Sequence, residues 1–378
     1  MGNTIPAMHV IANADTWMEG SAIEQLKTTS QLPGMVAVAG MPDLHPGRGY
    51  PVGAAFLSKG VFYPALVGND IGCGMSFYQM DLPKAKWSGQ KLAQKLGSID
   101  GPLDDEWSAA IEQSGLTQHP HAKSLGTIGG GNHFAEIQQL DTLYVTAEEL
   151  EHKVPWLKPK SLQLLVHSGS RGLGEAILRA HVDVHSHNGL VAGTPDALEY
   201  MKEHDSALAF ASANRDLIGR RMLAKLRTQG TLGLDVHHNY VEEIEYNGST
   251  HWLHRKGATP SNQGLVMIPG SRGSYSYLVE PISSDRSLYS LAHGAGRKWK
   301  RKDCSGKLGP RVRFEDLVRT SMGSTVVCNN NAMMFEEVPQ AYKNIDSVIA
   351  SLLEAGLIKT IARFKPVMTY KKKEWCGC

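Results

Sequence analysis

The sequence predicts a mixed α/β protein. Short apolar runs that suit strands, such as Val36–Ala39 and Leu162–Val166, alternate with longer segments whose apolar residues follow helical spacing. The chain has 378 residues, of which 42% are hydrophobic, so it can bury a large core. Length alone permits one large domain or two, and no linker, repeat or low-complexity stretch marks a boundary.

Composition narrows the classes of protein. The formal net charge is only +2, which excludes an overall polycation but leaves room for a local basic patch. Glycine is in excess, with 39 residues against a usual share of about 7%. Five scattered cysteines give no disulfide framework, the Met1 end shows no signal peptide and no apolar run nears a membrane span. We therefore expect a cytoplasmic protein with no membrane partner.

The predicted elements follow from local patterns. A helix is expected over Thr16–Thr29, and a long helix or a pair of helices over Thr194–Gly230. Proline and glycine make Met41–Gly53 a loop by composition. The other expected elements are strands at Ala54–Phe56 and Phe62–Val67, a helix at Ile345–Ile358 and a final strand that reaches Lys371–Lys373.

The most informative stretch is Gly68–Met75, with the sequence GNDIGCGM. Asp70 and Cys73 are packed among glycines, which let backbone and ligands approach closely. A carboxylate and a thiolate in one turn form a mixed pair of hard and soft ligands, unlike the thiolates and imidazoles of structural zinc sites. The alternative is an ordinary turn that contains an Asp and a buried Cys.

Three histidines lie in similar surroundings. His133 follows the glycine run of Gly126–Gln138, and His167 ends an apolar strand. His238 has a histidine neighbour, but adjacent side chains point in different directions, so at most one of the two joins a given site. No Walker loop, dinucleotide fingerprint or G-x-S-x-G nucleophile motif is present in these segments.

Together these residues offer one carboxylate, one thiolate and three imidazoles. Five ligands exceed what one tetrahedral ion needs, whereas two ions sharing the thiolate would use all of them. Because the donor atoms are O, N and S, the identity of the metal stays open between Mn²⁺, Zn²⁺ and Fe²⁺. Taken singly, each histidine is equally well explained by an ordinary hydrogen-bonded side chain.

Two basic clusters are candidates for phosphate binding. His293 is followed by a dense positive group, which would suit an RNA or nucleotide phosphate. Its members are Arg297, Lys298, Lys300 and Arg301. Arg215, Arg220 and Arg221 form the other cluster, for which a solvated helix face is the default and nucleic-acid contact the alternative.

Across its whole length the sequence resembles the RtcB-type RNA ligases, which join an RNA 3′-phosphate or 2′,3′-cyclic phosphate end to a 5′-hydroxyl end with GTP and Mn²⁺. The resemblance rests on eight motifs in family order from Met41 to Arg297, with a tail at Ala341–Lys343 and Lys371. The motifs are MPDLHPGRG, GNDIGCGM, GTIGGGNHFAEIQ, HSGSRGLG, DVHHNY, HRKGAT, IPGS and HGAGR.

The resemblance implies a single compact α/β domain over residues 1–378 with a central cleft for two metal ions. It implies that His293 attacks GTP, carries GMP and passes it to the RNA 3′-phosphate, after which the 5′-hydroxyl displaces GMP. Asp43 would assist guanylylation, while Arg171, Arg297 and Arg301 would bind phosphates. The implied Mn²⁺ ligands are Asp70, Cys73, His133, His167 and His238, with Cys73 as the bridge. The implied nucleotide contacts are Asn132, Glu136, Ser271, His293, Gly294, Tyr342 and Lys371.

This chain departs from the family pattern in two ways. It looks shorter than common members, and it ends in KKKEWCGC, so Lys371 is chosen over Lys372 and Lys373 as the terminal family lysine. Cys376 and Cys378 match no family role. The compact form is similar to a branch found beside a release-factor-like protein, which would suggest repair of broken ribosomal or transfer RNA.

Three other functions fit parts of the pattern. A dinuclear metal phosphoesterase that opens cyclic phosphates would need the five metal ligands but not His293. A non-catalytic protein that binds RNA ends would form no covalent GMP adduct. A purely structural role for the glycine turns predicts no tightly bound metal.

Overall fold

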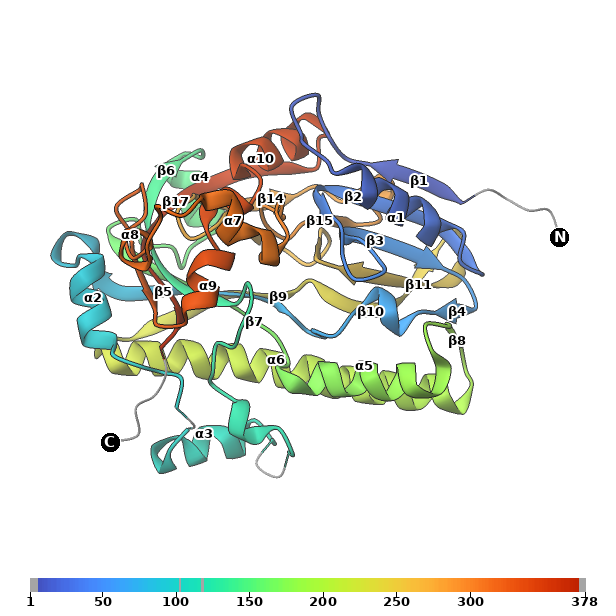
Figure 1. The fold of residues 1–378 in the computed structure, drawn as a ribbon, viewed down its shortest axis with the longest axis horizontal. Coiled ribbons are helices and arrows are strands. Elements are labelled where there is room, and N and C mark those ends of the chain that lie inside the picture. Colours follow the sequence, from blue (N-terminus) through green and yellow to red (C-terminus); the bar gives the residue numbers. More distant parts are fainter. Residues whose placement is uncertain (1–5, 102, 117–118, 374–378) are drawn as a thin grey trace.

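The computed structural model describes residues 6–101, 103–116 and 119–373, in which β-sheets and helices are mixed along the chain (Figure 1). Cys376 and Cys378 lie outside the described residues. The predicted α/β class is therefore confirmed, while a single domain over 1–378 stays a prediction. No helix in the described ranges has both the length and the hydrophobicity needed to cross a membrane.

Two large sheets form the framework. The five-stranded sheet has the order β1 (Ala7–Val10), β2 (Met35–His45), β3 (Val52–Ser58), β11 (Ser249–Lys256) and β10 (Asn239–Tyr246). The eight-stranded sheet has the order β13 (Val266–Pro269), β14 (Ser276–Pro281), β17 (Ile358–Lys372), β6 (Phe134–Leu143), β7 (Ser161–Ser168), β5 (Gly74–Pro83) and β9 (Gly230–His237), and β16 (Thr325–Cys328) pairs with β17. Two short pairs complete the strands, β12 (Ala258–Pro260) with β15 (Ser290–Ala292) and β4 (Val61–Phe62) with β8 (Leu190–Val191).

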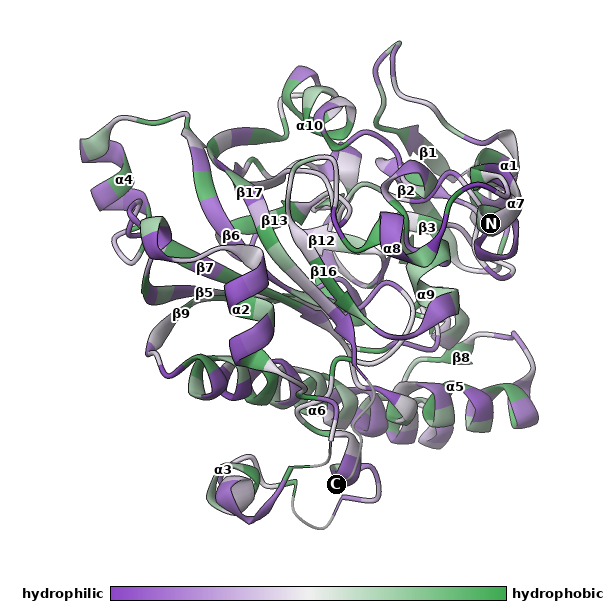
Figure 2. Ribbon diagram, turned by 60° about the vertical axis from the view of Figure 1, so that its left-hand side comes forward, coloured by the Kyte–Doolittle hydropathy of each residue, from purple (hydrophilic) through white to green (hydrophobic). Residues whose placement is uncertain are grey.

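The helices cover the outside of the sheets. The longest is α6, which runs under strands β5, β7 and β9 (Figures 1 and 2). Thr194 caps its N-terminus, Pro195 occupies the first turn and Arg227 ends it in the left-handed conformation. The helices are α1 (Gly20–Ser30), α2 (Gly89–Leu96), α3 (Ser108–Gln113), α4 (Ala147–Lys153), α5 (Gly172–His185), α6 (Pro195–Leu226), α7 (Cys304–Leu308), α8 (Phe314–Leu317), α9 (Asn331–Glu336) and α10 (Ile345–Glu354).

The eight-stranded sheet is buried on both faces. Successive residues of β5 point to opposite sides, so Tyr78 joins the core under α2 and α6 while Phe77 joins the core on the other face. On that second face Phe77 packs edge-on against Phe364 of β17, with ring centroids 5.1 Å apart. Because a core covers each face of the sheet, β5 is almost continuously apolar.

Several expected elements need correction. Met41–His45 belongs to β2, because an irregularity between Gly40 and His45 lets the chain rejoin its ladder with β3 despite the proline. The strand expected at Phe62–Val67 is wrong, because β4 ends at Phe62 and a 3₁₀ helix follows at Pro64–Leu66. The long helix is single, and the helix at Ile345 and the final strand are confirmed.

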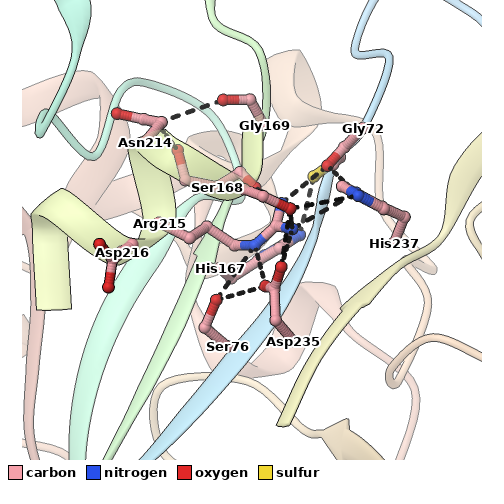
Figure 3. A network of polar contacts seen from close by, with 12 residues as sticks. Gly72, Ser76, His167, Ser168, Gly169, Asn214, Arg215, Asp216, Asp235 and His237 are labelled. Carbon is pink, nitrogen blue, oxygen red and sulfur yellow. Dashed lines mark hydrogen bonds and ion pairs between the residues drawn. The ribbon is translucent and has the colours of Figure 1, made fainter. Parts of the chain in front are cut away.

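The arginine cluster on α6 was also misjudged. Arg215 is fully buried, and neither a solvated face nor nucleic-acid contact describes it. Its guanidinium pairs with Asp235 of β9 at 2.6 and 2.9 Å and donates to the carbonyls of Gly72 and Ser168 (Figure 3). Arg220, one turn further along, is half exposed and pairs with Asp216 in the same helix. The buried pair thus fastens α6 to the ends of three strands.

We expect Arg215→Met to lower the free energy of unfolding by about 3–5 kcal/mol, because it leaves the Asp235 carboxylate without its counter-ion and removes the guanidinium donor from two backbone carbonyls. Arg220→Met on the same helix removes only an exposed ion pair and should cost less than about 1 kcal/mol. Urea unfolding followed by circular dichroism measures both. Equal losses in the two variants would show that the buried pair does not hold the sheet and helix together.

Candidate metal and nucleotide site

A cavity of about 1150 Å³ lies where the ends of the two sheets meet. Every residue that the sequence and the resemblance singled out for the site lines it, except Asp43, which lies behind His293. The lining residues from that set are Asp70, Cys73, Asn132, His133, Glu136, His167, Arg171, His238, Ser271, His293, Gly294, Arg297, Arg301, Tyr342 and Lys371. Residues spread over about 300 positions of the sequence therefore converge on one cavity.

The register of the eight-stranded sheet brings three of these side chains together. Phe134 pairs with His167 across β6 and β7, while Gly74 pairs with Ser168 across β5 and β7. Cys73 directly precedes β5, and His133 directly precedes β6. Their side chains therefore meet that of His167 at the end of the sheet where β5 and β6 begin and β7 ends. The Cys73 Sγ lies 3.3 Å from Nε2 of His133 and 3.1 Å from Nε2 of His167.

Asp70 completes one side of this group. Its Oδ2 lies 2.7 Å from Nε2 of His133, and the turn is held by Asn239, whose side chain donates to the Asp70 carbonyl. Gly72 follows at a φ of +75° against α6, where a Cβ would lie 2.7 Å from the Cβ of Ala211. Only glycine allows the turn to pass this close to the helix.

The donor set fits a metal ion. Cys73, His133 and His167 present ligand atoms within 4.8 Å of one another, and all three residues are buried. Burial lowers the pKa of His167 and His238 well below the ordinary histidine range, which keeps both rings neutral and able to offer a lone pair. Among the described residues, Nδ1 of His238 has no hydrogen-bond partner. An unpartnered buried nitrogen beside a thiol and two imidazoles is what a metal site requires.

Of the two adjacent histidines, only His238 faces the cavity. Its ring centroid lies 5.2 Å from that of His167 and 4.8 Å from that of His293. His237 points toward α6, with Nδ1 2.9 Å from the Gly72 carbonyl. The two adjacent side chains therefore point in different directions, as expected, and only that of His238 lines the cavity.

His293 is oriented by a buried carboxylate. Its Nδ1 lies 2.6 Å from Oδ2 of Asp43, which is fully buried in β2, and its backbone N–H donates to the same oxygen. Lys343 fixes this part of β2 by donating to the carbonyls of Pro42 and Leu44. With Nδ1 turned to the carboxylate, Nε2 is the ring nitrogen left for chemistry.

Glu136 is buried beneath another part of the cavity. It accepts hydrogen bonds from Gln138 and from Thr369, the residue opposite it in the ladder of β6 and β17. Burial raises the pKa of its carboxyl to about 7, against the opposing effect of these donors and of Lys371. The group therefore changes charge near neutral pH.

A second buried carboxylate, Glu337, was missed by the sequence reasoning. It pairs with Arg297 at 3.1 Å and Arg301 at 3.2 Å, accepts from the Tyr342 hydroxyl and lies 3.7 Å from Nζ of Lys371. Burial opposes its ionisation, but these cations lower its pKa overall. No glycine turn surrounds Glu337 in the sequence, and its only signal is its nearness to the Ala341–Lys343 tail element.

The remaining predicted residues occupy different parts of the wall. Lys371 is buried and donates to the Gly131 carbonyl, whereas Lys372 and Lys373 do not line the cavity, which favours the choice of Lys371. Arg171 lies so close to Gly129 that a Cβ there would reach within 1.8 Å of its guanidinium. Ser271 makes a hydroxyl contact with Ser274 at the far wall.

Comparison with known proteins identifies the family. The family described as "tRNA-splicing ligase RtcB" matches residues 25–100 and 103–372. A protein named RNA-splicing ligase RtcB2, from Escherichia coli strain ATCC 25922, is 51% identical over 97% of this chain and 96% of its own length. RNA-splicing ligase RtcB of Escherichia coli K12 is 30% identical over 94% and 95% of the two chains. A tRNA-splicing ligase RtcB from Nanoarchaeum equitans is 30% identical over 93% and 92%. The chain therefore belongs to the RtcB family of RNA ligases.

Proposed function

We propose that this protein joins an RNA 3′-phosphate or 2′,3′-cyclic phosphate end to a 5′-hydroxyl end, with GTP as cosubstrate and His293 as the nucleophile. The observation that carries the proposal is the 2.6 Å approach of His293 Nδ1 to the buried Asp43 carboxylate, beside the group of Cys73, His133 and His167. A structural histidine would need neither an orienting carboxylate nor an adjacent set of metal donors.

In the first step Nε2 of His293 attacks the α-phosphorus of GTP. A P–N bond forms, the bond from the α-phosphorus to the bridging oxygen breaks, and pyrophosphate leaves. The ring becomes cationic as the bond forms, and Asp43, already beside Nδ1, stabilises that charge. The nucleophile is thus activated by orientation and by charge rather than by a separate base.

Two divalent ions, Mn²⁺ by family resemblance, would be held by Asp70, Cys73, His133, His167 and His238. When bound, such ions neutralise phosphate charge and orient the reacting oxygens. Around them Arg171, Arg297 and Arg301 supply further positive charge for the phosphates of GTP or RNA. The remaining roles in the reaction belong to side chains of the protein.

The nucleotide would be held on the side of the cavity formed by β6 and β17. Ionised Glu136 accepts from the N1–H and N2–H₂ groups of guanine, and Asn132, Ser271, Gly294, Tyr342 and Lys371 line the space around it. GMP then passes from His293 to the RNA 3′-phosphate, and the 5′-hydroxyl displaces GMP to seal the strand. A cyclic end is first opened to a 3′-phosphate in the same cavity.

The proposed setting is the cytoplasm, in accord with the free thiols of Cys73, Cys304 and Cys328 among the described residues. Repair of broken ribosomal or transfer RNA, in association with a release-factor-like protein, is the proposed role. It rests on the similarity to the compact branch of the family alone.

The first test is incubation of purified protein with Mn²⁺ and α-labelled GTP, followed by a denaturing gel. We expect an acid-labile label on the wild type and none on His293→Ala, because the attacking nitrogen is gone. His187→Ala, which removes an exposed histidine outside the cavity, should keep the label. If His293→Ala lost the label but still opened cyclic phosphates, the same site would have a second, phosphoesterase activity. An unlabelled wild type with metal bound would instead favour phosphoesterase or RNA-end binding.

Removal of the thiolate should weaken metal binding. We expect Cys73→Ser to bind Mn²⁺ at least tenfold more weakly, since it replaces the donor that lies between two imidazoles. Cys328→Ser, which changes a buried cysteine outside the cavity, should retain the metal. Mass spectrometry of metal content after gel filtration measures both, and equal content in the two variants would refute the assignment.

GTP affinity should depend on pH through Glu136. Below its pKa of about 7 the carboxyl carries a proton and can no longer accept from both guanine N–H groups. The dissociation constant at saturating Mn²⁺ should therefore rise about tenfold from pH 8 to pH 6, as the ionised fraction falls. Glu136→Gln should bind weakly at every pH, with that dependence lost. Glu175→Gln, at an exposed position of the cavity wall, should behave as wild type.

A further inference from the structure

A second cavity of about 510 Å³ combines two indole rings with three lysines. The indoles belong to Trp17 and Trp299, and the lysines are Lys298, Lys307 and Lys343. The only acidic residue in its lining is Asp15. Neither the proposed chemistry nor the motifs of the family resemblance use these two tryptophans.

The lysines lie over the indoles. Lys298 and Lys307 approach the Trp299 ring at 5.9 and 5.4 Å from its centroid, and Lys343 lies 5.8 Å from that of Trp17. Trp17 is 48% exposed, an unusual state for so large an apolar ring. Flat aromatic faces next to positive charges suit a ligand that has both planar rings and phosphates.

Both indoles are fixed on well-held backbone. The amides of Lys298 and Trp299 donate to the Ala341 carbonyl at 2.8 and 3.2 Å, and the Trp299 carbonyl accepts from Arg297. Trp17 follows Thr16, whose hydroxyl bonds to Asn13 and to Ser351 of α10. Because the backbone at both positions is already held, little backbone freedom is lost when a base stacks on either ring.

The second cavity adjoins the first. Lys298 and Trp299 line both, and they lie on the segment that begins at His293. A flexible chain with its end at His293 would thus leave the catalytic cavity past Trp299. Lys298 and Lys307 are exposed and outnumber the one carboxylate among the described lining residues, and Lys343 adds a buried positive charge. The cavity therefore favours an anionic chain, which argues for a nucleic acid rather than a peptide of ordinary composition.

We propose that this second cavity is a subsite for an unpaired nucleotide of the RNA strand whose end is being joined. The base stacks on Trp17 or Trp299, and the exposed Lys298 and Lys307 contact its flanking phosphates. This inference rests on the proposed ligase function and adds a requirement, namely single-stranded RNA next to the break. Ends inside a blunt duplex cannot reach these rings without unpairing.

The test is fluorescence anisotropy with labelled RNA that carries a 3′-phosphate, with Mn²⁺ and without GTP, so that no ligation occurs. For RNA with an unpaired end, Trp17→Ala should raise the dissociation constant about tenfold, while Trp17→Phe restores most of the affinity. Lys307→Ala should weaken binding and reduce the dependence of affinity on salt by about one phosphate contact. For a blunt duplex of equal length, wild type and variants should bind equally weakly.

Two controls separate the possible failures. Tyr144→Ala removes an aromatic ring of similar exposure (46%) that lines neither cavity, and it should bind RNA as wild type. The GMP label from GTP should form normally on Trp17→Ala and Lys307→Ala, because neither residue lines the catalytic cavity. If the label formed normally and the RNA affinity of the variants were unchanged, the proposed RNA subsite would be wrong. The second cavity would then be a candidate site for a protein partner. No label on the wild type would instead count against the proposed function.

Discussion

The arrangement of the site depends on the buried pair between Arg215 and Asp235. The Arg215 guanidinium extends from α6 between the strand ends. It donates to the carbonyl of Gly72, which precedes Cys73, and to that of Ser168, which follows His167. Charge-assisted bonds of this kind are short and directional, and removal of water from the pair strengthens them. The distance between the thiol and the imidazoles is thus fixed by a residue that never enters the cavity.

The cationic side chains of the cavity wall are neutralised to different extents. Glu337 is surrounded by Arg297, Arg301 and Lys371, so each cation is partly neutralised and held in a defined position. Among the described residues Arg171 has no carboxylate within ion-pair distance. Burial lowers its pKa overall, although the nearby Asp70 carboxylate opposes this effect. A site built to receive a triphosphate needs positive groups that are fixed in advance but not fully satisfied.

Glycine-rich segments singled out candidate residues that line one cavity, whereas several strand boundaries were wrong. Asp70 and Cys73 lie in a glycine-rich turn, His133 directly follows one, and His167 lies in β7 just before another, and such segments are a local signal that a single sequence displays. Arg215 and Glu337 gave no such signal, because their partners Asp235 and Lys371 lie 20 and 34 positions away in the sequence. Met41–His45 was misjudged for a related reason, since His45 rejoins the ladder with β3 after an irregularity that the local sequence does not show. What could not be predicted is what tertiary contacts decide.

The position of Asp43 has a mechanical consequence. It lies in β2 of the five-stranded sheet, whereas Cys73 and His133 immediately precede strands of the eight-stranded sheet, and His167 ends one. The carboxylate beside His293 and three of the proposed metal donors thus belong to different sheets, while His238 lies between the last residue of β9 and the first residue of β10, where the chain passes from one sheet to the other. Any ligand that contacts both sheets in the cavity stabilises their association, because it binds only the folded state. Release of such a ligand removes that stabilisation, so the free and bound protein differ in how firmly the two sheets are held together.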